Sequence, residues 1–247
     1  MIHPVQWQPD GTPRSTLFDD VYRSIGRRGD RGLLQAREVF LQGCGLWSPT
    51  ATPLLWQGQS QWRMLETGFG LGLNFLVTWA AWRADPARAA KLQFMSIEAW
   101  PVSAEDIRQS VAAWPELHGL AHELAQAWQG MQAGMNCLRF DGGAVELDVY
   151  VGEVREMLPR IPAPVDSIYL DGFSPSVNPD MWHLDTLQAV AALARNGTQL
   201  ATWCVRKPVR DDLMRCGFEV HRALGVPPKS HRLQAIFRDR TEKLILL

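Results

Sequence analysis

The chain has 247 residues, 46% of them hydrophobic, and a formal net charge of −1 at pH 7. This length and composition are sufficient for one large domain, or for a domain with an appendage, built around one main core. The four cysteines are widely separated and form no C-x-x-C pair, which argues against a zinc ribbon or a disulfide scaffold: Cys44, Cys137, Cys204 and Cys216.

Residues 1–60 have the character of a Pro- and Arg-containing extension of short strands and loops. We expect this extension to be small and β-rich and to pack on a larger unit at residues 61–247. From about residue 62 onward, strand and helix patterns alternate. Such alternation is typical of a parallel sheet covered by helices.

Short apolar or alternating segments predict the strands. They lie at residues 62–66, 91–98, 137–140, 145–151, 165–173, 198–204, 217–224 and 232–238. The last segment follows its predecessor too closely for a helical crossover, so we expect it to pair antiparallel. The result is a mostly parallel sheet that closes with an antiparallel C-terminal hairpin.

Helices are predicted between these strands, at 73–84, from 103 toward 115, and at 117–129, 181–195 and 208–215. In the first, one face is expected to be apolar, formed by Leu73, Leu76, Val77, Ala80 and Ala81. In the second, Ser103 followed by Asp106 is typical of a capped helix start.

The stretch "LETGFGLGLNFL" joins the strand at 62–66 to the helix at 73–84 and has glycine at 68, 70 and 72. Its spacing does not fit a dinucleotide fingerprint, and the absence of G-K-[ST] removes a P-loop. S-adenosylmethionine fits better, since Glu66 can accept its ammonium and Glu98, at the end of the next strand, its ribose hydroxyls. A structural turn alone would also explain the glycines, but the two strand-terminal acids favour the cofactor.

A second polar segment, "YLDGFSPSVNPDMW", begins where the strand at 165–173 is expected to end. Asp171 therefore lies at the carboxyl edge beside the expected cofactor pocket, and the prolines that follow impose an irregular loop. Asp171 would serve as a simple turn or helix cap if it stood alone. In this context we predict that it faces a nitrogen nucleophile at the substrate entrance.

The chain resembles a known family, the methyltransferase domain of the bacterial MnmC tRNA-modification enzymes. The similarity rests on "FDDVYRS", "REVFLQG", "ETGFGLGLNFL", "WPEL" and "LDGFSPSVNPDMW". It implies a Rossmann-like class I methyltransferase of the α/β class with a seven-stranded sheet. It also implies transfer of a methyl group from S-adenosylmethionine to 5-aminomethyl-2-thiouridine at the tRNA wobble position. Many relatives continue into a flavin domain; here we expect a stand-alone form, with a separate FAD-dependent oxidoreductase preparing the substrate.

Carried over residue by residue, the resemblance implies cofactor contacts at Glu66, Gly68, Gly70, Gly72, Asn74, Glu98 and Glu153. Asp171 would be catalytic, with Tyr22 and Phe173 as walls of the uridine pocket. The stretch "CVRKPVR" departs from the small residues usual in the family. Two alternatives therefore stay open: a methyltransferase of this fold acting on another amine, and a non-catalytic RNA- or nucleotide-binding relative.

Basic residues outnumber acidic ones in both flanks of the chain, whereas the middle is acidic. Because phosphate contacts dominate RNA affinity, we expect these flanks to contact tRNA. The candidates are Arg27, Arg28, Arg31, Arg206, Lys207, Arg210, Lys229 and Arg232. His118 and His122 are four residues apart but have no third ligand nearby, so we predict no metal site.

The N-terminus lacks a basic region followed by an apolar run, and the longest apolar stretch, around 73–82, is too short to span a bilayer. We therefore expect a cytoplasmic, unexported protein with no membrane association.

Overall fold

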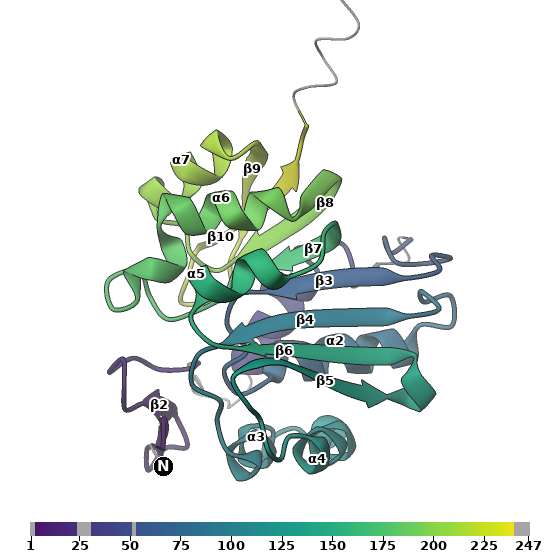
Figure 1. Cartoon of the computed structure of the whole chain (residues 1–247), viewed down its shortest axis with the longest axis vertical. Helices are drawn as coiled ribbons and strands as arrows, with labels where there is room; N and C mark the ends of the chain where they lie inside the picture. The colour runs from purple at the N-terminus through teal and green to yellow at the C-terminus, as the bar shows by residue number, and fades with distance from the viewer. Residues whose placement is uncertain (1–2, 24–30, 51–52, 240–247) are drawn as a thin grey trace, which may run out of the picture.

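The computed structural model describes residues 3–23, 31–50 and 53–239, and a single large sheet organises it (Figure 1). Eight strands form this sheet in the order β5-β6-β4-β3-β7-β8-β10-β9. Their bounds are β3 Trp62–Glu66, β4 Leu92–Glu98, β5 Gly134–Phe140, β6 Val145–Val151, β7 Val165–Tyr169, β8 Ala194–Thr202, β9 Phe218–Leu224 and β10 His231–Phe237.

Strand directions confirm the mostly parallel sheet. The neighbours β6, β4, β3, β7 and β8 run parallel, whereas β10 lies antiparallel between β8 and β9. The C-terminal hairpin is therefore as predicted. The strand number differs from seven, because β5 pairs antiparallel with β6 along its whole length, from Gly134 opposite Val151 to Phe140 opposite Val145.

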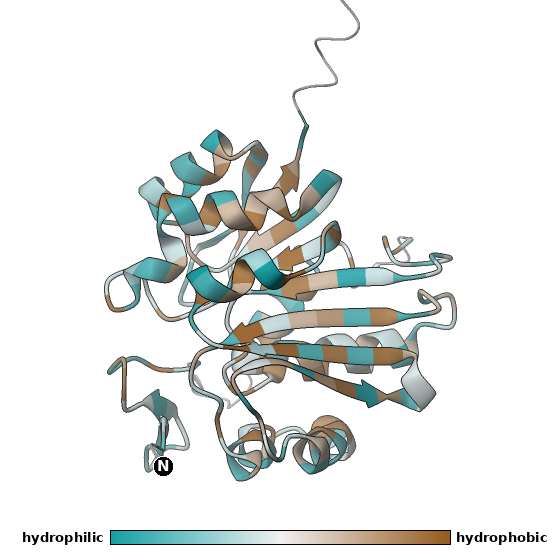
Figure 2. Cartoon of the chain, in the orientation of Figure 1, coloured by the Kyte–Doolittle hydropathy of each residue, from teal (hydrophilic) through white to brown (hydrophobic). Residues whose placement is uncertain are grey.

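Helices cover both faces of the sheet (Figure 1). One face carries α2 Leu73–Ala84, α3 Ala104–Ser110, the 3₁₀ turn Pro115–Leu117 and α4 His118–Ala127; the other carries α5 Val154–Met157, the 3₁₀ turn Leu158–Arg160, α6 Leu184–Ala192 and α7 Lys207–Arg215. Two further 3₁₀ turns, Asp141–Gly143 and Pro179–Trp182, lie in loops. In the hydropathy view, hydrophobic and hydrophilic residues alternate along the strands, and α7 is mostly hydrophilic (Figure 2).

The start of α3 follows the predicted capping motif. The Ser103 side chain accepts a hydrogen bond from the backbone N–H of Asp106, and the Asp106 carboxylate accepts one from the backbone N–H of Ser103. Each partner satisfies an N–H that would otherwise lack an acceptor at the helix start. The helix itself ends at Ser110, earlier than the expected stop near Pro115.

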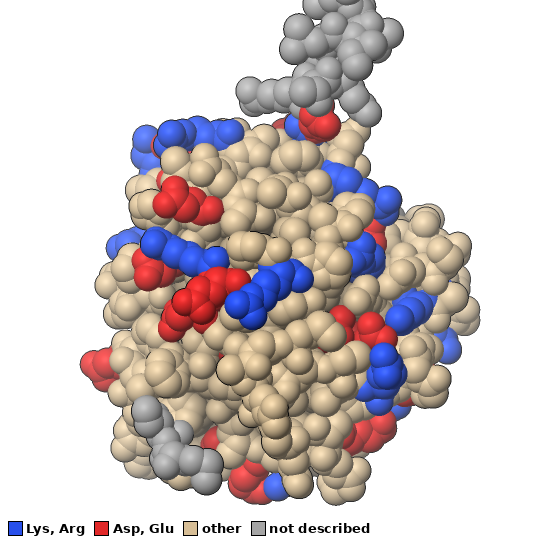
Figure 3. Space-filling view, viewed as in Figure 1, with Lys and Arg blue, Asp and Glu red and all other residues tan. Residues whose placement is uncertain are grey.

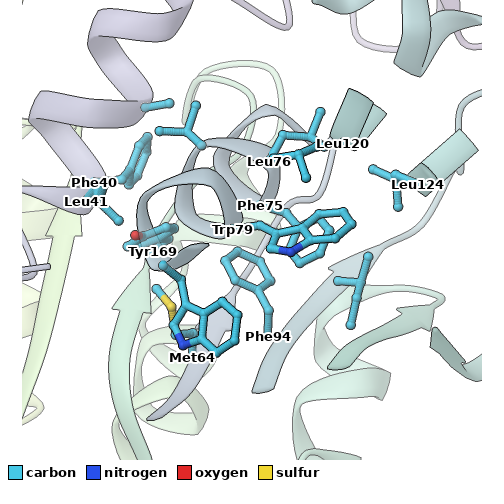
Figure 4. Packing of buried hydrophobic residues seen from close by; sticks show 14 of the residues in the cluster. Phe40, Leu41, Met64, Phe75, Leu76, Trp79, Phe94, Leu120, Leu124 and Tyr169 are labelled. Atoms are coloured by element: carbon cyan, nitrogen blue, oxygen red, sulfur yellow. The ribbon is translucent and has the colours of Figure 1, made fainter. Parts of the chain in front are cut away.

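The core between α2 and the sheet is largely aromatic (Figure 4). Phe75, Trp79, Phe94 and Tyr169 are each fully buried. Phe75 and Phe94 meet edge to face, with ring centroids 5.3 Å apart. Truncating such a side chain to alanine typically costs about 3–5 kcal/mol, because a cavity is left behind.

The helix α2 has the predicted bounds but not the predicted face. Leu76 and Val77 are buried, yet so are Phe75, Trp79 and Trp82. The other three predicted positions, Leu73, Ala80 and Ala81, are only partly buried. The helix is apolar nearly all round, because the N-terminal segment covers the side that faces away from the sheet.

That N-terminal segment begins with a small antiparallel hairpin, β1 Val5–Trp7 and β2 Pro13–Ser15. It continues, within the described residues, as a helical stretch comprising α1 Arg31–Leu34 and a π-helical part, Gln35–Leu41. The short strands agree with the expected β-rich extension, but this helical stretch was not predicted. Phe40 and Leu41 belong to the same buried cluster as α2, and Phe40 lies 5.3 Å from Tyr169 between ring centroids.

Candidate active site

The parallel strands β3, β4 and β7 end at one edge of the sheet, and the predicted acids gather there. Glu66 and Glu98 are the last residues of β3 and β4, and Asp171 follows β7 by two residues. In the register, Glu66 is paired with Ser96 on one side and with Tyr169 on the other. Neighbouring parallel strands therefore bring all three carboxylates to the same end of the sheet, where ligands bind in this class of fold.

A cavity of about 490 Å³ opens at this edge. This volume lies within the range of about 300–1,000 Å³ typical of small-molecule sites. Several predicted residues line it: Tyr22, Gly68, Gly70, Asn74, Glu98, Glu153, Asp171 and Phe173. Glu66 and Gly72 do not reach its wall.

The turn between β3 and α2 shows why glycine occupies positions 68 and 70. Gly70 has a φ of 54°, in the left-handed region that glycine tolerates. A Cβ on Gly68 would lie only 3.2 Å from the backbone oxygen of Asp171. Gly72, with a φ of 77°, precedes α2 and packs against Phe69, so its role is in the turn rather than in the cavity.

Both carboxylate oxygens of Glu98 are held by backbone N–H groups. Oε2 accepts from Gly70 and Oε1 from Trp100, each over 2.8 Å. Burial raises the pKa of this carboxyl, and the negative charge of Glu153 adds to the effect. Glu98 is thus fixed on the cavity wall in one orientation, with lone pairs left for hydroxyl donors.

Glu66 lies behind the cavity rather than in it. Its side chain is fully buried, with Oε2 accepting from the Ser96 hydroxyl over 2.7 Å and Oε1 from the Asn74 amide over 2.9 Å. Burial raises its pKa well above the usual value, and the neighbouring Asp171 and Glu98 act in the same direction. Asn74, which lines the cavity, holds Oε1 of Glu66, so a direct contact between Glu66 and the cofactor stays a prediction.

Asn74 joins Glu66 to Asp171, because its Nδ2 also donates to Oδ2 of Asp171 over 2.9 Å. The other carboxylate oxygen of Asp171, Oδ1, accepts from the Trp203 indole over 2.8 Å and from the backbone of Gly172 over 2.9 Å. Three donors fix the carboxylate in place. Burial nevertheless raises its pKa, and the hydrogen bonds and the positive charge of Lys229 only partly offset that effect.

The backbone of Asp171 is fixed as firmly as its side chain. The Thr67 hydroxyl donates to the Asp171 carbonyl over 2.6 Å and accepts from the Asp171 N–H over 3.0 Å. This pair links the ends of β3 and β7 directly. The position of the acid is therefore determined by the ends of the strands and not by the loop that follows.

Three aromatic rings form one wall of the cavity. Phe18 stacks on Phe173 with ring centroids 4.8 Å apart, and Tyr22 meets Phe173 edge to face at 5.0 Å. The loop is fixed on its other side, because the Trp182 indole donates to the Phe173 carbonyl over 2.8 Å. A planar ring can stack on such a wall.

Trp203 and Arg23 were not predicted as site residues, and Lys229 was predicted only as a general phosphate contact. The Lys229 ammonium lies 3.4 Å from the centroid of the Trp203 ring, and both residues line the cavity. Trp203 directly follows β8, so the rule that ligands bind at carboxyl edges would have found it. Arg23 stacks on Trp114, and its Nε and Nη1 have no hydrogen-bond partner in the described part of the chain; no sequence signal marks it.

The predicted basic contacts are dispersed. Arg31 lies on the cavity wall, and Arg206 lies on a smaller neighbouring cavity. Lys207 and Arg210 line neither, and both pair with Asp211, at 2.7 and 3.2 Å. Figure 3 shows basic side chains gathered over α7.

Arg232 is buried and donates to the Glu38 carbonyl, so the prediction of a phosphate contact there is wrong. Arg27 and Arg28 lie outside the described residues.

The two histidines considered for a metal have other partners. Nε2 of His118 lies 3.3 Å from the Ala112 carbonyl, and His122 contacts Gln126 at 2.9 Å. In the described ranges, one group of potential ligands, Cys137, Glu146 and Asp148, lies on β5 and β6, and none of the three lines the cavity.

None of the helices in the described part of the chain has the length and apolar character needed to cross a membrane.

A sheet of this order, with a glycine-rich turn after β3 and a ligand cavity at its carboxyl edge, defines a class I methyltransferase fold. A family model described as "S-adenosyl-L-methionine-dependent methyltransferase" matches residues 115–238. The chain belongs to this family, and its cofactor is S-adenosylmethionine.

Curated relatives are similar over nearly the whole chain. The chain is 52% identical to the "tRNA 5-methylaminomethyl-2-thiouridine biosynthesis bifunctional protein MnmC" of Acidovorax sp. (strain JS42), over 98% of this chain and 36% of that protein. The protein of the same name from Delftia acidovorans is 52% identical over 96% of this chain and 35% of its own length. The chain thus spans about a third of these relatives.

A solved structure supports the fold. The crystal structure of MNMC2 from Aquifex aeolicus aligns with a TM-score of 0.72 and 18% identity, covering 99% of this chain and 74% of that one. At this identity the similarity concerns the fold alone.

Proposed function

We propose that this methyltransferase acts on tRNA, and that it converts 5-aminomethyl-2-thiouridine at the wobble position to its 5-methylaminomethyl form. The names of the relatives at about 52% identity support this choice of substrate. One observation carries the chemistry: Asp171, fixed by three hydrogen bonds, shares a single cavity with Gly70, Glu98 and an aromatic wall. That cavity can hold a cofactor and a planar base side by side.

The residues around the glycine turn fit S-adenosylmethionine. Side chains at positions 68 and 70 would fill space beside the backbone of Asp171 and the Tyr22 ring, so the turn leaves room only because both are glycine. Glu98 is oriented to accept hydroxyl groups of a ribose, and Glu153 lies on the same wall, where an adenine would be bound. Asn74 lines the cavity and joins Glu66 to Asp171, so both acids would be fixed beside the bound cofactor. When bound, the cofactor supplies an electrophilic methyl group.

Asp171 would position the substrate nitrogen and accept its proton. A primary alkyl amine has a pKa of about 10 and arrives mostly as an ammonium, without the lone pair that the reaction needs. Methyl transfer to the amine also leaves a proton on nitrogen that must be removed. A carboxylate whose pKa is raised by burial accepts a proton more readily than an exposed one, so Asp171 suits this role.

The aromatic wall would hold the uridine. Phe173 lies two residues after Asp171, and its ring contacts those of Phe18 and Tyr22. Bases of single-stranded RNA segments are commonly bound by stacking on such rings. The 5-substituent of a base stacked on this wall would then lie close to the Asp171 carboxylate.

The aminomethyl substrate requires a preceding reaction. We propose that a flavin-dependent oxidoreductase supplies it, since the relatives are named bifunctional proteins and this chain spans about a third of their length. The tRNA substrate would place the protein in the cytoplasm.

The experiment that tests the proposed function is nucleoside analysis of tRNA from cells that lack this chain. We expect the unmethylated aminomethyl nucleoside to accumulate and the methylaminomethyl nucleoside to disappear. A normal amount of the methylated nucleoside would contradict the proposal. Loss of a different methylated amine would identify a methyltransferase of this fold with another substrate.

A further inference from the structure

A second cavity of about 340 Å³ adjoins the one that contains Asp171. The two share three lining residues, Ser174, Trp203 and Lys229. We infer that this second cavity binds the phosphodiester of the nucleotide next to the methylated uridine. The inference rests on the proposed function, because it assumes that an RNA strand enters the first cavity.

The charges on the wall indicate an anionic ligand. Arg206, Lys229 and His231 line the second cavity, and no acidic residue among those that the structure describes does so. Arg206 and Lys229 make no salt bridge within the described ranges, whereas Lys207 and Arg210, one and four residues beyond Arg206, both pair with Asp211. Arg206 is therefore available to a phosphate, and the charge of Lys229, which also acts on Asp171, makes the wall more positive. Phosphates receive a large share of protein–RNA contacts.

Polar groups around these cations add further donors. The hydroxyls of Ser174 and Ser176 lie 3.0 Å apart on one side, and Ser230 lines the same cavity. The wall also runs through Val205 and Arg206 into the start of α7, whose N-cap has no side-chain hydrogen bond. The N-terminal end of a helix carries partial positive charge, which favours an anion there.

The position of the cavity indicates a phosphate within a strand rather than a free ion. Ser174 follows Phe173 of the aromatic wall, so a strand whose base stacks on Phe173 would continue past Ser174 into the second cavity. Trp203 separates the two sites, with its indole N–H on Asp171 and its ring under Lys229. Pro175 and Val205 supply an apolar surface for the adjoining sugar or base.

The test measures binding of an anticodon stem–loop RNA that contains the unmethylated nucleoside, across a range of KCl concentrations. Arg206→Gln is compared with Arg215→Gln, which removes the same charge at the other end of α7, where Arg215 is exposed and pairs with Asp212. We expect Arg206→Gln to weaken RNA binding on the order of tenfold and to reduce the slope of log K against log[salt] by about 0.7–0.9, the loss of one phosphate contact. Arg215→Gln should bind as the wild type does.

A second arm measures methyl transfer to the free nucleoside, which has no phosphate to lose. Here Arg206→Gln should match the wild type. Equal effects of Arg206→Gln and Arg215→Gln on RNA binding would overturn the inference. So would an Arg206 effect confined to inorganic phosphate, used as a competitor, with RNA binding unchanged.

Failure of the inference and failure of the proposed function are distinguishable. Wild-type protein that binds the stem–loop through Arg206 but transfers no methyl group contradicts the proposed function and supports the phosphate subsite. The opposite result is methylation of the stem–loop by the wild type together with unchanged RNA binding and salt slope in Arg206→Gln. It would support the proposed function and contradict the phosphate subsite.

Discussion

The indole of Trp203 donates a hydrogen bond to Oδ1 of Asp171 over 2.8 Å, and this contact links the residue after β8 to the acid after β7. The bond stabilises the ionised form of Asp171 and so lowers its pKa, against the larger opposing effect of burial. Trp203→Phe keeps an aromatic ring under Lys229 but removes the donor.

We therefore expect Trp203→Phe to raise the pKa of Asp171. Because the ionised form is the active one, the acidic limb of the kcat/KM profile should move to higher pH. At pH values on the acidic limb, kcat/KM of the variant should be about tenfold lower than that of the wild type, as for the loss of one hydrogen bond to a charged group. An unshifted limb, measured with the same substrate, would show that Asp171 does not titrate in the reaction.

Asp171→Asn should nearly abolish methyl transfer while leaving cofactor binding intact. The amide can still form hydrogen bonds but cannot accept the proton of the amine, so a loss of about 10²-fold or more is expected for a general base. Rates and the Kd of S-adenosylmethionine would be measured together. Asp185→Asn, at an exposed position of α6, serves as control. Near-normal transfer by the Asp171 variant would refute the assigned role.

Glu66→Gln should make stability less dependent on pH. Burial raises the pKa of Glu66 in the folded protein, so the folded state binds the proton more tightly than the unfolded state does. The contribution of Glu66 to the free energy of unfolding is therefore fully present below the usual Glu pKa of 4.5. It falls as the pH rises above that value, by up to about 1.4 kcal/mol per pH unit. Unfolding midpoints of variant and wild type, compared from pH 5 to pH 8, should diverge in favour of the variant. Parallel curves would contradict a raised pKa.

Gly68→Ala should weaken cofactor binding. The added Cβ would lie 3.2 Å from the Asp171 carbonyl, in backbone that Thr67 holds rigidly, so the ends of β3 and β7 would have to separate. We expect a decrease in affinity on the order of tenfold, by titration calorimetry with S-adenosylmethionine. Gly119→Ala is the matched control, because in α4 its Cβ would meet nothing within 4 Å. Equal affinities of the two variants would place the cofactor elsewhere.

Local sequence patterns were sufficient to predict most of the sheet. Strand and helix periodicity alternated clearly from residue 62 onward, and the short connection before β10 required an antiparallel strand. The helix at 31–41 was missed because its burial depends on α2, which lies distant in sequence. The predicted face of α2 was wrong because Phe75 and Trp79 pack between the helix and the sheet, where Phe75 meets Phe94 and Trp79 meets Phe140.

The site was predictable where it follows from strand ends. Glu98 and Asp171 lie at carboxyl edges, and both line the cavity. The depth of Glu66 was not predictable, because it depends on Ser96 from the neighbouring strand and Asn74 from α2 taking its oxygens. Likewise, which of the basic residues near α7 are neutralised depends on rotamers around Asp211, which no linear pattern specifies.

The central claim is tested most directly by methyl transfer in a purified system. The chain would be incubated with labelled S-adenosylmethionine and tRNA that carries 5-aminomethyl-2-thiouridine, followed by digestion to nucleosides and mass spectrometry. We predict that the label appears in 5-methylaminomethyl-2-thiouridine and that Asp171→Asn removes it. Label in no nucleoside, or in a different one, would contradict the account.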